Sequence, residues 1–363
     1  MSSGLDKLPL RDELRGEVPY GAPQLDVAVQ LNVNENPYGP SEKVVRAIAA
    51  AVAEVSTTLN RYPDREASAL RADLATFLNA DGAPSLTADE VWAANGSNEI
   101  MLQLMQAFGG PGRTAVSFAP TYSMYPEYAR NTSTRWVTGR RSDDFGLDLP
   151  GAVELIERER PAIVLLCSPN NPTGTTLSER EIETVYEAAP GVVVVDEAYA
   201  EFRRAGRASA TTMLPGRPRL VVTRTMSKAF ALAGGRLGYL AASSSVVDAV
   251  RIVRLPYHLS AVTQAVARAA LSCSGELLAR VADLRGERDA AVTWLREQGF
   301  TTADSDANFV LFGVFSDRHA VWQGLLDRGV LIRETGPDGW LRVSIGTPEE
   351  MSAFRRALLE VAK

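Results

Sequence analysis

The chain has 363 residues, of which 45% are hydrophobic and 23% charged, so it is long enough for two globular domains and is not a disordered or low-complexity protein. Its 38 Lys and Arg against 44 Asp and Glu give a net charge of -6, which disfavours nucleic acid and membrane surfaces as partners. Two cysteines and two histidines provide neither a disulfide framework nor a Cys/His metal site, so we expect no metal. No signal peptide and no apolar run of the ~20 residues that span a membrane are found, which predicts a soluble, cytoplasmic protein.

Apolar residues at helical spacing after Ser41 predict an amphipathic helix with Ser41 as its N-cap. From residue 91 onward, predicted strands alternate with helices. The expected strands are 91–94, 114–118, 162–167, 192–195, 220–223 and 237–241. The expected helices include 98–108 and one that opens with the capping box Ser178 to Glu181. Strands that are apolar on both faces and separated by helices predict an α/β fold with a mostly parallel, doubly wound sheet.

The C-terminal part has a different pattern, with expected strands at 308–312, 330–333 and 341–345 and a closing helix from about Pro348. Apolar residues share one face of the last strand, so Arg342 and Ser344 lie on the other. The helical stretch 246–271, broken by Pro256, is the expected bridge to this smaller α+β domain. We expect an N-terminal arm over 1–40, a large domain over 41–250 and a small domain over 251–363.

Ligands of open α/β sheets bind beyond the carboxyl ends of the strands, so functional residues are expected in the loops that follow the strands. The sequence Asn95-Gly96-Ser97-Asn98 leads into a helix N-terminus that suits a phosphate, although an ordinary strand-to-helix turn is the commoner explanation of such a loop. Residues 168–174 place two asparagines between prolines, which makes either a rigid mount for hydrogen-bond donors or a plain loop.

Two charged residues follow buried strands. Asp196 comes directly after four valines, and a buried carboxylate is costly unless it is paired, so a cationic partner is expected unless Asp196 merely caps the next turn. Lys228 lies among small and apolar residues, where desolvation would lower its pKa and free its amine for Schiff-base chemistry, although most lysines are solvated. Together with Tyr199, these two residues form the set that a pyridoxal phosphate enzyme needs.

At this point the chain resembles the fold-type I pyridoxal phosphate aminotransferases. The segments 168–174, Asp196-Glu197-Ala198-Tyr199 and Ser227-Lys228 to Arg236 match the motifs of that superfamily in order and separation. Within it the chain most resembles the histidinol-phosphate aminotransferase family in its actinobacterial branch, along nearly its whole length. Further matches are Leu31-Asn32-Val33-Asn34-Glu35-Asn36-Pro37, Asn60 to Asp64, and Arg254 to Ser260.

The resemblance implies a role for each matching residue. Lys228 would be the Schiff-base lysine and the acid/base, Asp196 the partner of the pyridine nitrogen, and Asn171 and Tyr199 donors to the phenolic oxygen of the cofactor. Tyr122 would stack on the ring. The phosphate of the cofactor would be bound by the backbone of Ser97 and Asn98 and by Thr225, Ser227 and Arg236.

The same resemblance implies a homodimer with shared sites, because Tyr62 would reach the cofactor phosphate of the neighbouring subunit. Arg342 would bind the substrate carboxylate and Arg333 a second anionic group, unless Arg333 is a plain surface arginine. Tyr20, Asn98 and Tyr257 would line the substrate pocket, unless the tyrosines simply pack. His258 and His319 are expected to be structural.

The implied activity is a transaminase that interconverts histidinol phosphate plus 2-oxoglutarate and imidazole-acetol phosphate plus glutamate, in histidine biosynthesis. Three alternatives stay open: an aromatic amino acid (phenylalanine) aminotransferase, a decarboxylase of phosphorylated substrates on the same scaffold, and a non-catalytic regulator that senses pyridoxal phosphate.

Overall fold

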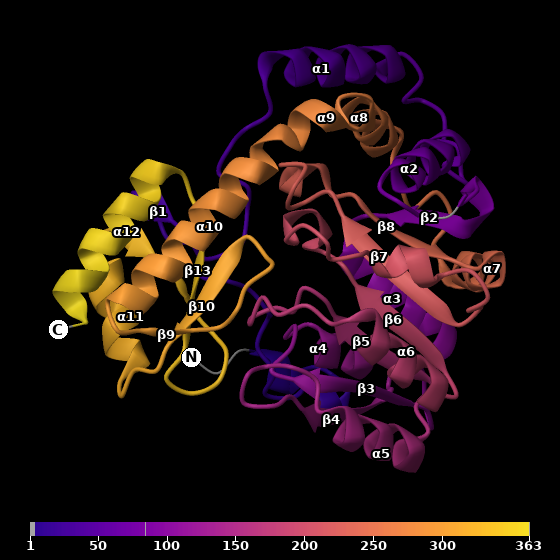
Figure 1. Ribbon diagram of the computed structural model, residues 1–363. Helices are drawn as coiled ribbons and strands as arrows, with labels where there is room; N and C mark the ends of the chain where they lie inside the picture. The colour runs from indigo at the N-terminus through magenta and orange to yellow at the C-terminus, as the bar shows by residue number, and fades with distance from the viewer. Residues whose placement is uncertain (1–3, 84, 363) are drawn as a thin grey trace.

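The largest element of the protein is a seven-stranded sheet in the order β2-β8-β7-β6-β5-β3-β4 (Figure 1). The computed structural model describes residues 4–83 and 85–362. The strands are β2 (Val91–Ala94), β3 (Thr114–Ala119), β4 (Arg135–Arg140), β5 (Ile163–Cys167), β6 (Val192–Asp196), β7 (Leu220–Thr225) and β8 (Gly238–Ala242). Strands β4, β3, β5, β6 and β7 pair in parallel, and β8 is antiparallel to both β2 and β7. The predicted mostly parallel α/β sheet is confirmed.

Helices bury both faces of this sheet. In β6, Val193 and Val195 belong to one core cluster, whereas Val192 and Val194 belong to the other. The first cluster includes residues of α2 (Ser68–Ala80), α5 (Leu149–Glu159), α6 (Glu179–Ala188) and α8 (Ala261–Ser272). The second includes residues of α3 (Ser97–Phe108), α4 (Tyr125–Asn131) and α7 (Ser244–Val253). Because the valines of β6 alternate between two filled cores, a register slip of one residue would exchange the two sets of side chains.

The predicted helix starts are present. Helix α1 (Glu42–Ser56) begins after Ser41, whose Oγ accepts a hydrogen bond from the N–H of Val44 at 3.3 Å, and α1 packs along α8. In the capping box of α6, Ser178 accepts from the N–H of Glu181 at 3.3 Å, and the Glu181 carboxylate accepts from the N–H of Ser178 at 2.7 Å. Local side-chain chemistry therefore sets these two helix starts.

A second, antiparallel sheet has the order β12-β13-β10-β9 and lies beside α10 (Ala279–Glu297), α11 (Arg318–Leu326) and α12 (Pro348–Val361) (Figure 1). Its strands are β9 (Thr301–Thr302), β10 (Phe309–Gly313), β12 (Arg333–Glu334) and β13 (Leu341–Ser344). The N-terminal segment joins this part of the molecule, because β1 (Val29–Gln30) pairs in parallel with β11 (Val330–Leu331).

The single strand expected at 330–333 is wrong, because it is divided between two sheets. Residues 330–331 pair with β1, whereas residues 333–334 pair with β13. Between them the carbonyl of Ile332 accepts a hydrogen bond from the indole N–H of Trp322 at 2.9 Å, so that carbonyl is satisfied outside either sheet.

The helices that connect the two sheets extend past residue 271, where the predicted helical stretch 246–271 ends. Helix α7 packs on α3 and α8 packs on α1, and the chain then passes through α9 (Ser274–Leu277) into α10, which contacts β9 and β10. Figure 1 shows α10 running from α9 to the C-terminal sheet. Helix α10 was not predicted, because its buried stripe is interrupted by a charged residue, Arg288.

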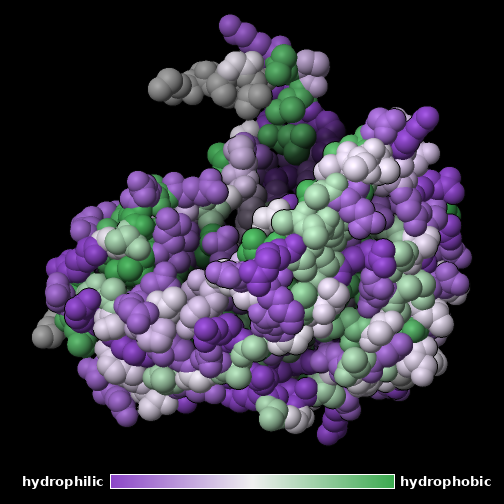
Figure 2. All heavy atoms as spheres, turned by 90° about the horizontal axis from the view of Figure 1, so that it is seen from above, coloured by the Kyte–Doolittle hydropathy of each residue, from purple (hydrophilic) through white to green (hydrophobic). Residues whose placement is uncertain are grey.

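Hydrophilic residues cover much of the face shown in Figure 2, and hydrophobic residues appear there in scattered groups. Among the residues that the structure describes, no helix combines the length and the apolar composition needed to cross a bilayer.

Candidate active site

A cavity of about 470 Å³ lies at the carboxyl ends of β5, β6 and β7, between the large sheet and residues of the N-terminal segment and the C-terminal sheet. Almost all predicted site residues line it. They are Tyr20, Ser97, Asn98, Tyr122, Asn171, Asp196, Tyr199, Thr225, Ser227, Lys228, Arg236, Arg333 and Arg342. The loops that follow the strands, where α/β sheets bind ligands, therefore meet around one cavity.

Lys228 lies just after β7, and its Nζ donates a hydrogen bond to the carbonyl of Val33 at 3.0 Å. Burial, together with the nearby Arg342 guanidinium, lowers the pKa of the Lys228 amine to about 8. No carboxylate within residues 4–83 and 85–362 forms an ion pair with this lysine at 4.0 Å or less. The unprotonated fraction of the amine near neutral pH is therefore much larger than for an ordinary lysine, as a nucleophile or proton acceptor requires.

Asp196 is the last residue of β6 and is 4% exposed. Its carboxylate accepts hydrogen bonds from the Tyr125 hydroxyl at 2.9 Å and from the Thr223 hydroxyl at 3.2 Å. Burial raises the pKa of the Asp196 carboxyl to about 6, although both hydrogen bonds oppose the rise. The cationic partner expected from the sequence is not found among the described residues, because both partners are neutral hydroxyls. A cation bound in the cavity would complete this site.

Arg342 is a buried cation, in contrast to the buried anion Asp196. Among the described residues, no carboxylate pairs with its guanidinium. On β13 it lies on the same face as Ser344, as predicted, and donates to the carbonyl of Asn32 at 2.9 Å and to Oδ1 of Asn171 at 2.6 Å. Its Nε is buried without a partner, and burial lowers the pKa of Arg342 to about 10. An anion in the cavity would compensate this charge.

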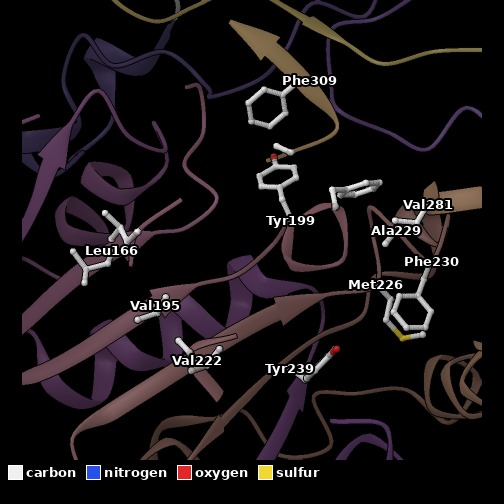
Figure 3. Close-up of a cluster of buried hydrophobic side chains, with 14 of the residues drawn as sticks. Leu166, Val195, Tyr199, Val222, Met226, Ala229, Phe230, Tyr239, Val281 and Phe309 are labelled. Carbon is white, nitrogen blue, oxygen red and sulfur yellow. The ribbon is translucent and has the colours of Figure 1, made fainter. Parts of the chain in front are cut away.

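Tyr199 lies between the two sheets, with its ring edge-on to Phe309 at 5.0 Å between ring centroids (Figure 3). Its hydroxyl accepts from Nδ2 of Asn34 at 3.0 Å and from Nδ2 of Asn171 at 3.4 Å. Because Arg342 has only donors, its bond to Oδ1 of Asn171 fixes the orientation of that amide and turns Nδ2 toward Tyr199. Burial raises the pKa of the Tyr199 phenol, so the hydroxyl keeps its proton.

One end of the cavity is a backbone cradle at the N-terminus of α3. Gly96, just before α3, has a φ of 86°, which favours glycine. A Cβ at Gly238 would lie 2.1 Å from the backbone N of Ser97, so β8 and the start of α3 approach as closely as glycine permits. The Thr225 and Ser227 hydroxyls are hydrogen-bonded at 3.0 Å beside it, and Arg236 donates to Ser227 at 3.5 Å. Free N–H groups, hydroxyls and a guanidinium suit a phosphate group.

The mouth of the cavity is built by the N-terminal segment and by residues near α4. The Tyr20 hydroxyl is hydrogen-bonded to the Ser123 hydroxyl at 2.9 Å, and Arg333 donates to the carbonyl of Gly21 at 3.4 Å. Oδ1 of Asn98 accepts from Tyr128 at 2.9 Å and from Tyr122 at 3.4 Å.

This chain matches the family model of class I and II aminotransferases over residues 26–358. The chain belongs to the class I and II aminotransferases. It is 61% identical to histidinol-phosphate aminotransferase from Thermobifida fusca, with 98% of this chain and 96% of that protein aligned. It is 59% identical to histidinol-phosphate aminotransferase 3 from Burkholderia lata, with 98% and 96% aligned. These relatives confirm the resemblance to the histidinol-phosphate aminotransferase family.

A solved structure of the Sinorhizobium meliloti histidinol-phosphate aminotransferase in complex with pyridoxal-5'-phosphate is similar to this chain with a TM-score of 0.83 and 26% sequence identity. The match covers 92% of this chain and 91% of that one. The expected fold-type I aminotransferase architecture is therefore confirmed.

Two predicted site residues of the aminotransferase lie outside its cavity. The rings of Tyr62 and Tyr257 stack on each other, with centroids 4.3 Å apart, on the protein surface, where Tyr62 is 78% exposed. For Tyr62 this agrees with an expected role in a neighbouring subunit. Tyr257 was expected to line the substrate pocket; it lies outside this cavity, and its ring stacks on that of Tyr62.

Several cavity residues of the aminotransferase were not predicted individually. The cavity is also lined by Asn32, Val33, Asn34 and Glu35, a segment that from the sequence was only a match to the family. Its density of asparagines is the signal that could have found it. Tyr125, which holds Asp196, offers no such signal, because a buried tyrosine usually packs.

Proposed function

We propose that this chain transfers an amino group between glutamate and imidazole-acetol phosphate, forming 2-oxoglutarate and histidinol phosphate, with pyridoxal phosphate as cofactor. The observation that carries the proposal is the charge pattern of the cavity. A desolvated amine, a buried carboxylate without a cation and a buried guanidinium without an anion face one space. Burying these uncompensated charges destabilises the empty protein, and ligands of complementary charge would compensate them.

The described residues fit the cofactor. Asp196 would accept the N–H of the pyridine ring, since this carboxylate lacks a protein cation, and Lys228 would bind the aldehyde. Asn171 and Tyr199 would donate to the phenolic oxygen. When bound, the cofactor supplies an electron sink for the carbon that loses a proton. The unprotonated amine of Lys228 would move that proton, and Asp196 would keep the ring nitrogen charged.

The remaining cofactor contacts follow from the cradle and from one aromatic ring. The backbone of Ser97 and Asn98, with Thr225, Ser227 and Arg236, would bind the cofactor phosphate. Tyr122 lines the cavity and packs edge-on to Tyr125 at 5.5 Å between centroids, which would hold its ring against the face of the pyridine.

The substrates require two anion sites, because glutamate carries carboxylates and histidinol phosphate a phosphate. Arg342 would bind the carboxylate through its guanidinium fork, and Arg333 at the mouth would bind the second anionic group. Tyr20 and Asn98 would contact the imidazole ring. Both substrates are water-soluble metabolites, and we propose that the enzyme works in the cytoplasm.

We further propose that the enzyme is a homodimer that shares its sites. The stacked Tyr62 and Tyr257 have exposed apolar neighbours in the same two segments: Leu59 is 53%, Ile252 84% and Leu255 73% exposed. Burial of such residues favours association. In this arrangement Tyr62 would contact the cofactor phosphate of the second subunit, and Tyr257 would pack beside it.

The domain division proposed for the enzyme is an arm over 1–40, a large domain over 41–250 and a small domain over 251–363. The extent of the two larger sheets supports it, since the seven-stranded sheet lies within 91–242 and the four-stranded sheet within 301–344.

An amino-acceptor panel on the purified enzyme tests the proposed activity. With glutamate as donor, we expect turnover of imidazole-acetol phosphate to exceed that of phenylpyruvate, and Arg333→Gln to raise KM for the phosphorylated acceptor far more than KM for glutamate. Preference for phenylpyruvate would identify an aromatic aminotransferase instead, and release of CO2 would identify a decarboxylase.

A further inference from the structure

Asn34 is a buried residue of the N-terminal segment with a left-handed backbone, φ 57°. Its N–H donates to Oγ of Ser344 at 2.9 Å, and its carbonyl accepts from Nδ2 of Asn308 at 3.0 Å. Its side-chain Oδ1 accepts from the Ser344 hydroxyl at 2.8 Å. The C-terminal part of the chain therefore holds both the backbone and the side chain of Asn34, and only Nδ2 remains to reach outward.

That remaining donor contacts the hydroxyl of Tyr199 at 3.0 Å. A phenol has one proton and two lone pairs. One lone pair of Tyr199 faces Nδ2 of Asn34, and the other faces Nδ2 of Asn171 at 3.4 Å. With both acceptor positions directed at amide donors, the phenolic proton points away from them, and no residue within 4–83 and 85–362 accepts it.

We propose that Asn34, held in place by Ser344, is a positioning residue that commits the Tyr199 hydroxyl to donating its proton into the cavity. The inference rests on the proposed function, because the acceptor of that proton is the phenolic oxygen of bound pyridoxal phosphate. Without the Asn34 amide the hydroxyl has a free lone pair and can rotate, so its donation weakens. An oxygen that loses a donor binds a proton more tightly.

Titration of the visible absorption band of the cofactor-loaded enzyme measures this effect directly. Asn34→Gly removes the amide and tolerates the left-handed backbone. We expect it to raise the midpoint of the titration by about one pH unit. Asn34→Asp keeps the shape of the side chain but offers Tyr199 an acceptor, and we expect a larger rise. Ser344→Ala should also raise the midpoint, but by less than Asn34→Gly does. Ser344→Thr keeps the hydroxyl, so its midpoint should equal that of the wild type.

A double-mutant cycle separates positioning from general damage. In a Tyr199→Phe background, Asn34→Gly should cause no further shift, because the residue through which it acts is gone. Ser117→Ala is the matched control, since it removes an equally buried serine that bonds to the carbonyl of Leu165 at 2.8 Å, away from the cavity. It should leave the titration unchanged.

The inference is overturned if Asn34→Gly leaves the midpoint of a normally coloured enzyme unchanged, or if its full shift persists without the Tyr199 hydroxyl. If Asn34→Gly fails to fold, Ser344→Ala carries the same test. A wild-type protein that shows no visible band with added pyridoxal phosphate would contradict the proposed function itself, and the inference with it.

Discussion

Nη1 of Arg342 donates a hydrogen bond to Oδ1 of Asn171 at 2.6 Å, which links β13 of the C-terminal sheet to the loop after β5. The two residues are 171 positions apart in the sequence. The bond fixes the orientation of the Asn171 amide, so the residue proposed to bind substrate also orients a residue proposed to bind cofactor. The two functions of the cavity therefore depend on the same contact.

Arg342→Lys keeps the positive charge but loses the planar fork and the bond to Asn171. We expect kcat/KM for glutamate to fall on the order of 100-fold, because more than one charge-assisted hydrogen bond is lost. Steady-state kinetics with glutamate as the varied substrate measure this. Arg328→Lys, in an exposed ion pair with Glu360, is the matched control and should behave as wild type. A loss of less than about threefold at Arg342 would contradict its assignment.

Asp196→Asn tests the cost of the buried carboxylate. Burial raises the pKa of Asp196 to about 6, so the folded protein binds a proton more tightly than the unfolded chain. Such a group destabilises the fold fully above pH 6, and the cost disappears as the pH falls toward 4. The cofactor-free variant should therefore be more stable than cofactor-free wild type at pH 7.5, by at most about 3 kcal/mol. When loaded with pyridoxal phosphate, the same variant should lose most of its activity.

Urea denaturation of the cofactor-free proteins at two pH values checks the sign. The stability difference should be smaller at pH 5 than at pH 7.5, because part of the wild-type carboxylate is then protonated. An Asp196→Asn variant that is less stable than wild type at both pH values would show that the carboxylate is compensated within the protein.

Gly238→Ala tests the cradle, since the added Cβ would lie 2.1 Å from the backbone N of Ser97. The start of α3 must move, and we expect the dissociation constant of pyridoxal phosphate to rise at least about tenfold. Gly286→Ala in α10 is the control, because nothing lies within 4 Å of its Cβ, and it should leave cofactor binding unchanged. Equal affinity in Gly238→Ala and wild type would remove the cradle from the proposed cofactor site.

The extent to which the sequence predicted this site depends on the range of the interactions. Asp196 and Lys228 were found because each follows a strand, and strand order alone brings such loops to one edge of the sheet. Asn34 was not assigned a role, because its partner Ser344 is 310 residues away and meets the N-terminal segment only in the folded chain, where the N–H of Ser344 also donates to the carbonyl of Leu31 at 2.9 Å. Tertiary contacts of this kind leave no local pattern.

The same limit explains where other expectations from the sequence differ from the structure. The expected cation beside Asp196 follows from the electrostatics of a buried carboxylate, but electrostatics does not say whether the protein or a ligand provides the cation. The strand expected at 330–333 was split because its two halves pair with strands far apart in the sequence. Tyr257 was expected in the substrate pocket by family match, and within a single chain its ring stacks on that of Tyr62 and does not line the cavity.

Mixed dimers test the sharing of sites between subunits. Tyr62→Ala should weaken the site of the neighbouring subunit, whereas Lys228→Ala disables the site of its own chain. A hybrid of the two variants would then contain one intact site, and we expect it to recover up to about half of the wild-type activity per dimer. Activity of the hybrid should be compared with that of each variant homodimer. A hybrid that is no more active than the mean of its parents would contradict shared sites.

The central claim is that the amine of Lys228 binds the cofactor in this cavity. Borohydride reduction of the purified, pyridoxal phosphate-loaded protein, followed by peptide mass spectrometry, tests it most directly. We expect one peptide to carry the reduced cofactor, with the modification on Lys228, and we expect Lys228→Ala protein of normal stability to carry none. Modification of a different lysine, or unmodified Lys228 in an active enzyme, would contradict it.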